Sequence, residues 1–216
     1  MTTTKPKSVE FFLQNVSFLK STTDPDNFPP ENLPEIAIVG RSNAGKSSVL
    51  NTLCMRKQLA HTSKTPGKTK LINFFSINYS QNEIARIIDL PGYGYANVDK
   101  STKKFWKNSL LNFLLERRSL IGIILVTDLR HPLGNLDLQL LHKLSHRMLY
   151  FHILFNKSDK LNNSNRINNV KVAMKSLPFE LSKINSKTSY SAFSSTKKKG
   201  VNELFSVLKL WIDGLN

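Results

Sequence analysis

A glycine-rich octapeptide in the first quarter of the chain has the residue spacing of a phosphate-binding loop. Residues 40–47 read Gly-Arg-Ser-Asn-Ala-Gly-Lys-Ser, which fits G-x-x-x-x-G-K-[ST], and they lie between an apolar run and an amphipathic segment. In such a loop the backbone N–H groups surround phosphate oxygens, the lysine reaches the β- and γ-phosphates, and the last hydroxyl ligates Mg²⁺. We therefore expect Lys46 to act in catalysis and Ser47 to bind the metal. The expected phosphate-binding residues are Gly40, Arg41, Ser42, Asn43, Ala44, Gly45, Lys46 and Ser47.

A second motif, Asp-Leu-Pro-Gly at residues 89–92, ends another apolar run. A carboxylate at this place can hold Mg²⁺ through water, and the glycine N–H can reach the γ-phosphate. Taken alone, the tetrapeptide would be read as an ordinary Pro-Gly turn after a strand. Beside a phosphate-binding loop the nucleotide interpretation is favoured. We expect Asp89 to bind the metal, Gly92 to contact the γ-phosphate during catalysis, and Leu90 and Pro91 to line the same site.

A third motif predicts which base is bound. Residues 156–159 read Asn-Lys-Ser-Asp after the apolar run 150–155, in the form N-K-x-D. The carboxylate of Asp159 can accept hydrogen bonds from N1–H and the 2-amino group of guanine, and adenine offers neither, so adenine would leave a carboxylate unpaired. The site is therefore expected to bind GTP and GDP, with base contacts from Asn156, Lys157, Ser158 and Asp159.

Small G proteins with these motifs also carry a Ser-Ala-Lys-like triplet whose backbone contacts guanine O6, followed by three residues, a glycine and a helix. Counting back from Gly200 makes the triplet 194–196, so the expected base contacts are Phe193, Ser194 and Ser195. The pair Ser191-Ala192 resembles the motif more closely but has the wrong register.

The elements that position these motifs alternate along the chain, as in an α/β sheet with helices on both faces. Six strands are predicted, and the short connection 80–82 requires an antiparallel hairpin in an otherwise mostly parallel sheet. We expect an N-terminal extension at 1–34 and one G domain at 35–216. The expected strands are 36–39, 73–79, 84–89, 122–127, 150–155 and 188–191, and the expected helices are 46–55, 102–117, 136–146, 164–176 and 201–212.

Three segments together are more specific than these general motifs. They are the loop 40–47, the segment Thr62 to Phe75, and the sequence Asp-Leu-Pro-Gly-Tyr-Gly-Tyr-Ala at 89–96. In combination they resemble the EngB (YihA/YsxC) family of bacterial ribosome-biogenesis GTP-binding proteins, from about residue 33 to the C-terminus. The resemblance implies a P-loop GTPase fold, Mg²⁺-dependent GTP hydrolysis, assembly of the large (50S) ribosomal subunit, and a role in normal cell division and septation.

The same resemblance implies further site residues. The threonine of Pro-Gly-x-Thr is the family's switch threonine, which makes Thr69 a metal ligand and catalytic residue, with Thr65 as the alternative. Tyr93 stands where Ras-like proteins keep the glutamine that orients water, so slow hydrolysis is expected. Asn43 matches a P-loop asparagine that binds a monovalent cation in related GTPases, which makes K⁺ a further candidate cofactor and Asn43 a candidate catalytic residue. The remaining nucleotide contacts expected in the first switch are Gly67, Lys68, Thr69, Lys70 and Leu71.

The charge of the chain points to a polyanionic partner. Lys and Arg total 31 against 15 Asp and Glu, a formal charge of +16. A solvated Lys-rich surface is the alternative interpretation. Because no RNA-binding module is appended, we expect the G domain itself to contact rRNA of the pre-ribosomal particle. The basic clusters are Lys64, Lys68 and Lys70, then Lys100, Lys103, Lys104 and Lys107, then Arg117 and Arg118, and finally Lys197, Lys198 and Lys199.

Other functional classes fit less well. A small-molecule kinase or ATPase has no use for the guanine motif at 156–159, and a trafficking GTPase would need a lipidation signal that the C-terminal residues do not provide. No apolar run is long enough for a signal peptide or a membrane span. Cys54, in a predicted helix, is expected to be a buried reduced thiol. We expect a cytoplasmic bacterial monomer that binds neither membrane nor DNA.

Overall fold

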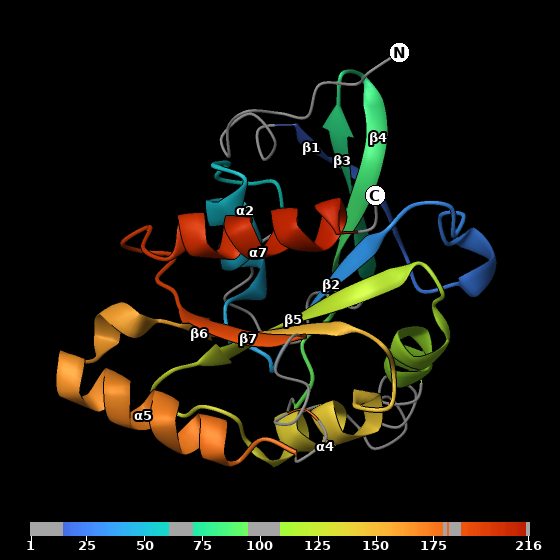
Figure 1. The fold of residues 1–216 in the computed structure, drawn as a ribbon. Coiled ribbons are helices and arrows are strands. Elements are labelled where there is room, and N and C mark those ends of the chain that lie inside the picture. Colours follow the sequence, from blue (N-terminus) through green and yellow to red (C-terminus); the bar gives the residue numbers. More distant parts are fainter. Residues whose placement is uncertain (1–14, 61–70, 95–108, 179–180, 182–186, 215–216) are drawn as a thin grey trace.

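The computed structural model describes residues 15–60, 71–94, 109–178, 181 and 187–214. Within these residues seven strands form one sheet, in the order β1-β3-β4-β2-β5-β6-β7 (Figure 1). All six predicted strands are present, with bounds within two residues of the prediction, so the α/β fold class is confirmed with one strand more than expected. The strands are β1 (Val16–Thr22), β2 (Glu35–Val39), β3 (Ile72–Tyr79), β4 (Asn82–Asp89), β5 (Leu120–Asp128), β6 (Tyr150–Asn156) and β7 (Thr188–Ala192).

Strand β3 runs against the others, as its short connection to β4 predicted. It pairs antiparallel with β1 and β4, whereas the pairs from β4 through β2, β5 and β6 to β7 are parallel. The turn from β3 to β4 consists of Ser80 and Gln81, whose φ angles of 47° and 69° are those that a two-residue type I′ turn needs. Because the other strands share one direction, their carboxyl ends lie along one edge of the sheet.

Strand β1 corrects the predicted number of strands from six to seven. It pairs with β3 from Val16↔Ile77 to Thr22↔Ile72, with an irregularity between Phe18 and Lys20. Only Val16 is fully buried in this strand, so the sequence lacks the apolar alternation that identifies a half-buried strand. Part of the predicted N-terminal extension therefore forms one edge of the sheet.

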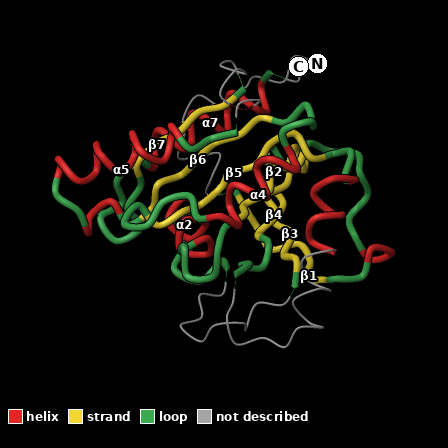
Figure 2. The backbone as a smooth tube through the Cα atoms, turned by 90° about the horizontal axis from the view of Figure 1, so that it is seen from below, coloured by secondary structure: helices red, strands yellow, loops and turns green. Residues whose placement is uncertain are grey.

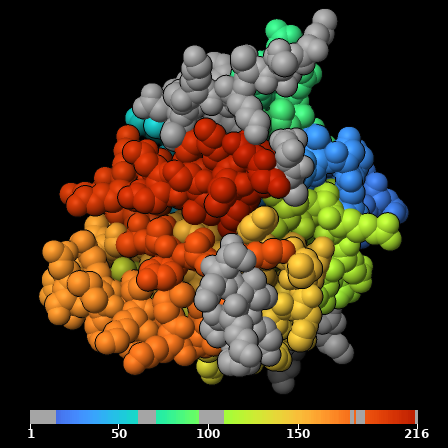
Figure 3. All heavy atoms as spheres, in the orientation of Figure 1, coloured from blue at the N-terminus to red at the C-terminus, as the bar shows by residue number. Residues whose placement is uncertain are grey.

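The helices cover both faces of the sheet (Figures 1 and 2). Helices α2 (Lys46–Leu53) and α7 (Val201–Asp213) pack on one face of the sheet. The C-terminal residues that include α7 form a band across the visible surface in Figure 3. Helices α4 (Asn135–Leu144) and α5 (Asn163–Lys175) and the helical residues 109–116 pack on the other. Gly122 lets α7 approach closely, because a Cβ there would lie 2.5 Å from the Trp211 ring. Two 3₁₀ turns, η1 (Pro25–Asn27) and η2 (Ser158–Lys160), complete the described elements.

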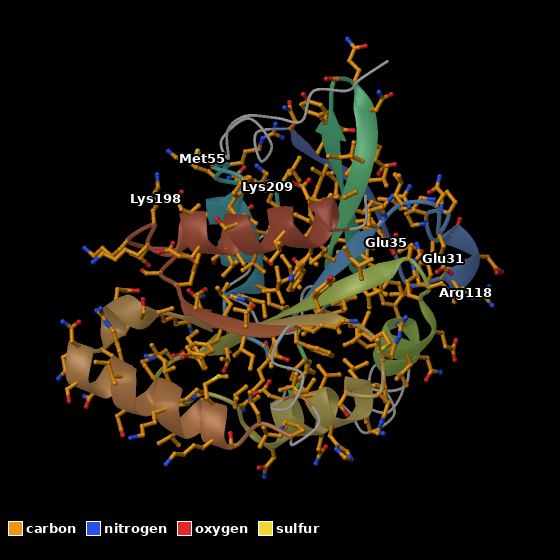
Figure 4. The ribbon with its side chains drawn as sticks, in the orientation of Figure 1. Glu31, Glu35, Met55, Arg118, Lys198 and Lys209 are labelled. Carbon is orange, nitrogen blue, oxygen red and sulfur yellow. The ribbon has the colours of Figure 1, made fainter. Side chains whose placement is uncertain are left out.

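A cluster of charged side chains lies at the amino ends of the parallel strands, where Glu35 begins β2. The buried Glu35 carboxylate accepts hydrogen bonds from Arg117 Nε at 2.7 Å and from Ser119 Oγ at 2.6 Å, and Arg86 Nη1 lies 3.4 Å away. Arg117 is itself buried, so its inclusion in the basic surface was wrong. An arginine surrounded by apolar strands and helices needs such a carboxylate partner, because an unpaired buried charge is costly. Figure 4 shows Glu35 at this end of the sheet, with Glu31 and Arg118 beside it.

Cys54 directly follows α2 and is buried, as expected. Burial raises the pKa of its thiol to about 12. Because the thiolate is the reactive form, this cysteine is inert near neutral pH.

Candidate functional site

The described nucleotide motifs meet at the carboxyl ends of the parallel strands. The loop 40–47 follows β2, Asp89 ends β4, Asn156 ends β6, and Phe193 follows β7. Asp89 pairs with β2 through Ile38, and Ser158 donates its backbone N–H to the Phe193 carbonyl at 3.0 Å. Segments as far apart in sequence as Gly40 and Phe193 therefore surround one place, the usual ligand-binding edge of such sheets.

The backbone of the loop 40–47 needs its two glycines. Gly40 and Gly45 have φ angles of 153° and 99°, and Asn43 also has a positive φ, 64°. A Cβ on Gly40 would lie 2.2 Å from the Val126 carbonyl oxygen, and one on Gly45 would lie 2.4 Å from Asn156 Nδ2. Only residues without a side chain fit here, so the loop can wrap closely against the neighbouring strand ends and lead directly into α2.

Lys46, Ser47 and Asp89 form a charged group at the start of α2. The Lys46 side chain is only 9% exposed, and Ser47 Oγ donates to Asp89 Oδ2 at 3.0 Å. Burial lowers the pKa of Lys46, and burial raises that of Asp89, while each opposes the shift of the other by Coulomb attraction. Among the described residues, the second oxygen of Asp89 is buried without a hydrogen-bond partner.

An unpartnered carboxylate oxygen beside a serine hydroxyl fits Mg²⁺. This ion prefers oxygen ligands, keeps several waters, and binds proteins through one or two carboxylates together with substrate phosphates. Asp89 and Ser47 supply such oxygens next to a helix N-terminus that favours phosphate. When bound, the ion would neutralise charge on the phosphates, and the ammonium group of Lys46 would add a second positive charge.

The base-binding segment is held against the loop by side-chain hydrogen bonds. Asn156 Nδ2 donates to the Ala44 carbonyl at 2.9 Å, and Ser194 Oγ donates to Asp159 Oδ1 at 2.6 Å. Ser195 Oγ lies 3.5 Å from Asn156 Oδ1. The hydrogen bond from Ser194 lowers the pKa of Asp159, so its carboxylate is ionised near neutral pH and can accept hydrogen bonds from a base.

The loop after β7 contains Ser194, the first residue of the triplet predicted by counting back from Gly200. Ser194 and Lys199 exchange two backbone hydrogen bonds, of 3.0 and 3.1 Å, and close a tight turn before α7. Gly200 has a φ of 81°, and a Cβ there would lie 2.3 Å from the Ala192 carbonyl oxygen. Ser191 lies instead against His152, at 2.9 Å. The structure thus places Ser194, not Ser191, against Asp159.

Comparison with known proteins agrees with this geometry. Residues 35–157 match the family model described as 50S ribosome-binding GTPase. The chain is 47% identical over 174 residues to the probable GTP-binding protein EngB of Acinetobacter baumannii, covering 81% of this chain and 79% of that protein. It is 40% identical over 198 residues to the probable GTP-binding protein EngB of Coxiella burnetii, covering 92% and 93%. The chain belongs to the EngB family. It is a GTP-binding protein and a GTPase, as the motifs predicted.

Solved structures share the EngB fold. The crystal structure of a probable GTP-binding protein EngB aligns with a TM-score of 0.62 at 22% identity, covering 83% of this chain and 99% of that one. Era, solved in complex with MgGDPNP and a segment of 16S ribosomal RNA, aligns with a TM-score of 0.60 at 21% identity, covering 83% and 56%. None of the described helices has the length and apolar character that crossing a bilayer requires.

Part of the EngB site lies outside the described residues. This holds for Thr65, Gly67, Lys68, Thr69 and Lys70, whose contacts stay predictions. Leu71, next in sequence, is described and 43% exposed.

Two aspartates that the sequence analysis did not single out also lie at the site. Asp128, at the end of β5, lies 2.9 Å from Lys157 Nζ, which also donates to the Asn43 carbonyl at 2.7 Å. Hydrogen bonds from Arg130 and Lys157 lower the pKa of Asp128 despite its partial burial. A carboxylate at the end of an apolar strand was the available signal. The second aspartate, Asp137, contacts Tyr93.

Proposed function

We propose that this EngB protein is a molecular switch that uses Mg²⁺ with GTP and acts in assembly of the large ribosomal subunit. The observation that carries the proposal is that the model described as 50S ribosome-binding GTPase matches residues 35–157, which include the phosphate loop, Asp89 and Asn156. The formal charge of +16 supports an rRNA partner, because phosphate contacts dominate affinity for nucleic acids. By family resemblance we extend the proposal to normal cell division and septation, and to a monomer in the bacterial cytoplasm.

The proposed metal site combines described and undescribed residues. Ser47 and Asp89 are its described ligands. Their mutual hydrogen bond supports this role, as does the second Asp89 oxygen, which has no partner among the residues that the structure describes. Thr69 is the proposed third ligand, with Thr65 as the alternative. Lys46 and the Gly92 N–H are proposed to bind the γ-phosphate. Asn43 is the proposed K⁺ ligand; its side chain is exposed, while its backbone carbonyl accepts a hydrogen bond from Lys157.

Basic side chains are proposed to make the ribosomal contacts. The turn Lys197-Lys198-Lys199 exposes all three lysines, and Lys198 projects away from α7 (Figure 4). Lys100, Lys103 and Lys104 follow the Asp-Leu-Pro-Gly motif in sequence, outside the described residues. Because switch loops change their order with nucleotide state, lysines next to them would make RNA binding depend on the γ-phosphate.

Co-sedimentation with ribosomal particles tests this proposal. The wild-type protein is expected to migrate with large-subunit precursors more strongly with a non-hydrolysable GTP analogue than with GDP. Replacing Lys100, Lys103 and Lys104 by glutamine should weaken binding to the particles. It should also reduce the slope of the logarithm of the binding constant against the logarithm of salt concentration by up to about three, near one per phosphate contact. The matched control replaces Lys171, Lys175 and Lys183.

Two results would contradict the proposal. One is the absence of the wild-type protein from every particle fraction in both nucleotide states. The other is an equal loss of binding for the two triple variants, in both nucleotide states, which would indicate attraction by bulk charge.

A further inference from the structure

Tyr93, directly after the Asp-Leu-Pro-Gly motif, is anchored by its side chain to α4. Its hydroxyl donates to Asp137 Oδ1 at 2.6 Å. Asp137 is 1% exposed, and its other oxygen accepts the Gly134 N–H at 2.8 Å at the start of the helix. Burial raises the pKa of the Tyr93 hydroxyl well above its usual value, and Asp137 raises it further, so this hydroxyl stays protonated and acts as a donor.

The backbone of the same residue is bound to the phosphate loop. The Tyr93 carbonyl accepts the Ser42 N–H at 2.8 Å, and Arg41 and Tyr93 form a parallel bridge. Gly92 lies equally close, because a Cβ there would be 2.8 Å from both Lys46 Nζ and Ser42 Cα. Residues 92 and 93 therefore rest directly on the loop, beside the amine that a γ-phosphate needs.

The Tyr93 carbonyl is the part of this arrangement that a γ-phosphate would disturb. The Tyr93 carbonyl oxygen carries partial negative charge and takes up an N–H group of the phosphate loop. A γ-phosphate beside Lys46 would repel that oxygen and compete for the same donors. GDP has no γ-phosphate and makes no such demand. With GTP the Tyr93 carbonyl is therefore expected to leave Ser42, and the hydrogen bond from its hydroxyl to a buried carboxylate on α4 opposes that movement.

We propose that Asp137 is a positioning residue that, through the Tyr93 hydroxyl, holds residues 92–93 on the phosphate loop and thereby sets the preference between GDP and GTP. We call the arrangement with residues 92–93 on the phosphate loop latched, and the one in which they have left it released. GDP favours the latched arrangement and GTP the released one, and only such a difference in affinity can shift the equilibrium between the two arrangements. The Tyr93–Asp137 hydrogen bond stabilises the latched arrangement. Removing it should favour the triphosphate.

Tyr93→Phe removes the hydroxyl and keeps the ring, which packs against the core on the α4 face. The dissociation constants of fluorescent GDP and of a non-hydrolysable GTP analogue are measured on the full chain. The ratio of GTP-analogue affinity to GDP affinity should rise about tenfold, the factor that one hydrogen bond to a charged group provides. Tyr190→Phe is the matched control, because this half-exposed tyrosine lies on β7 away from α4, and it should leave the ratio unchanged.

A double-mutant cycle separates positioning from helix stability. Asp137→Ala removes the latch and also the acceptor of the Gly134 N–H, so its own effect mixes the two. In the Asp137→Ala background, Tyr93→Phe should no longer change the affinity ratio, because the hydroxyl has lost its partner. An unchanged or lowered ratio in Tyr93→Phe, or the same tenfold rise in both backgrounds, would overturn the proposal.

Discussion

Asp159→Asn should weaken GTP binding by about a hundredfold or more, because one hydrogen bond to the carboxylate is lost and the other keeps only an uncharged acceptor. The wild-type carboxylate is kept ionised by Ser194, and it is proposed to accept both N1–H and the 2-amino group of guanine. Asparagine offers an N–H group where the carboxylate offered an oxygen. XTP carries an oxygen in place of the 2-amino group, so the variant should bind XTP better than the wild type does.

Equilibrium titration with fluorescent GTP and XTP measures the affinity of the wild type and the variant for each nucleotide. The control is Asp24→Asn, because Asp24 caps the turn η1 and its side chain bonds only Asp26 and Asn27 among the described residues, neither of which belongs to a nucleotide motif. Loss of affinity for both nucleotides would indicate misfolding rather than base reading. Unchanged GTP affinity in Asp159→Asn would refute the role of this aspartate.

Lys46→Met should lower the rate of GTP hydrolysis at saturating nucleotide by about a hundredfold to a thousandfold, as removal of one preorganised charge-stabilising group does elsewhere. The ammonium group of Lys46 is buried in the candidate site, and methionine keeps much of the apolar length of its side chain. Single-turnover release of phosphate measures the chemical step.

Lys20→Met is the matched control, since Lys20 lies on β1 and donates to the Asn27 carbonyl far from the phosphate loop. Thermal unfolding without nucleotide reports any change in stability, because Asp89 loses a neighbouring positive charge in Lys46→Met. Hydrolysis at the wild-type rate would show that Lys46 does not stabilise the transferred phosphoryl group.

The sequence predicted the central sheet well because its strands are apolar and continuous. Strands β5 and β6 are buried along most of their length, and such runs are easily recognised between turns. Strand β1 was missed because it is an edge strand with one fully buried residue, and its place depends on β3. Local sequence carries little information on such tertiary pairing.

In the candidate site, too, local motifs could be predicted and contacts between distant residues could not. The phosphate loop, Asp89 and the segment 156–159 are local motifs with a fixed spacing, so the sequence was sufficient to predict that they follow parallel strands, and the structure brings them together there. Asp137 lies 44 residues from Tyr93 and looks like an ordinary acidic residue in the first turn of a helix. Arg117 looked like a surface charge, because nothing nearby in sequence reveals that Glu35 is its buried partner. Contacts made only by folding could not be read from local patterns.

Competition for the bound nucleotide tests the central claim most directly. Fluorescent GDP is bound to the wild-type chain in the presence of Mg²⁺, and unlabelled GTP, GDP and ATP are added in separate titrations. The account predicts that GTP and GDP displace the probe while ATP at the same concentrations does not, because adenine cannot satisfy the Asp159 carboxylate. Displacement by ATP as effective as that by GTP would contradict a guanine-specific switch.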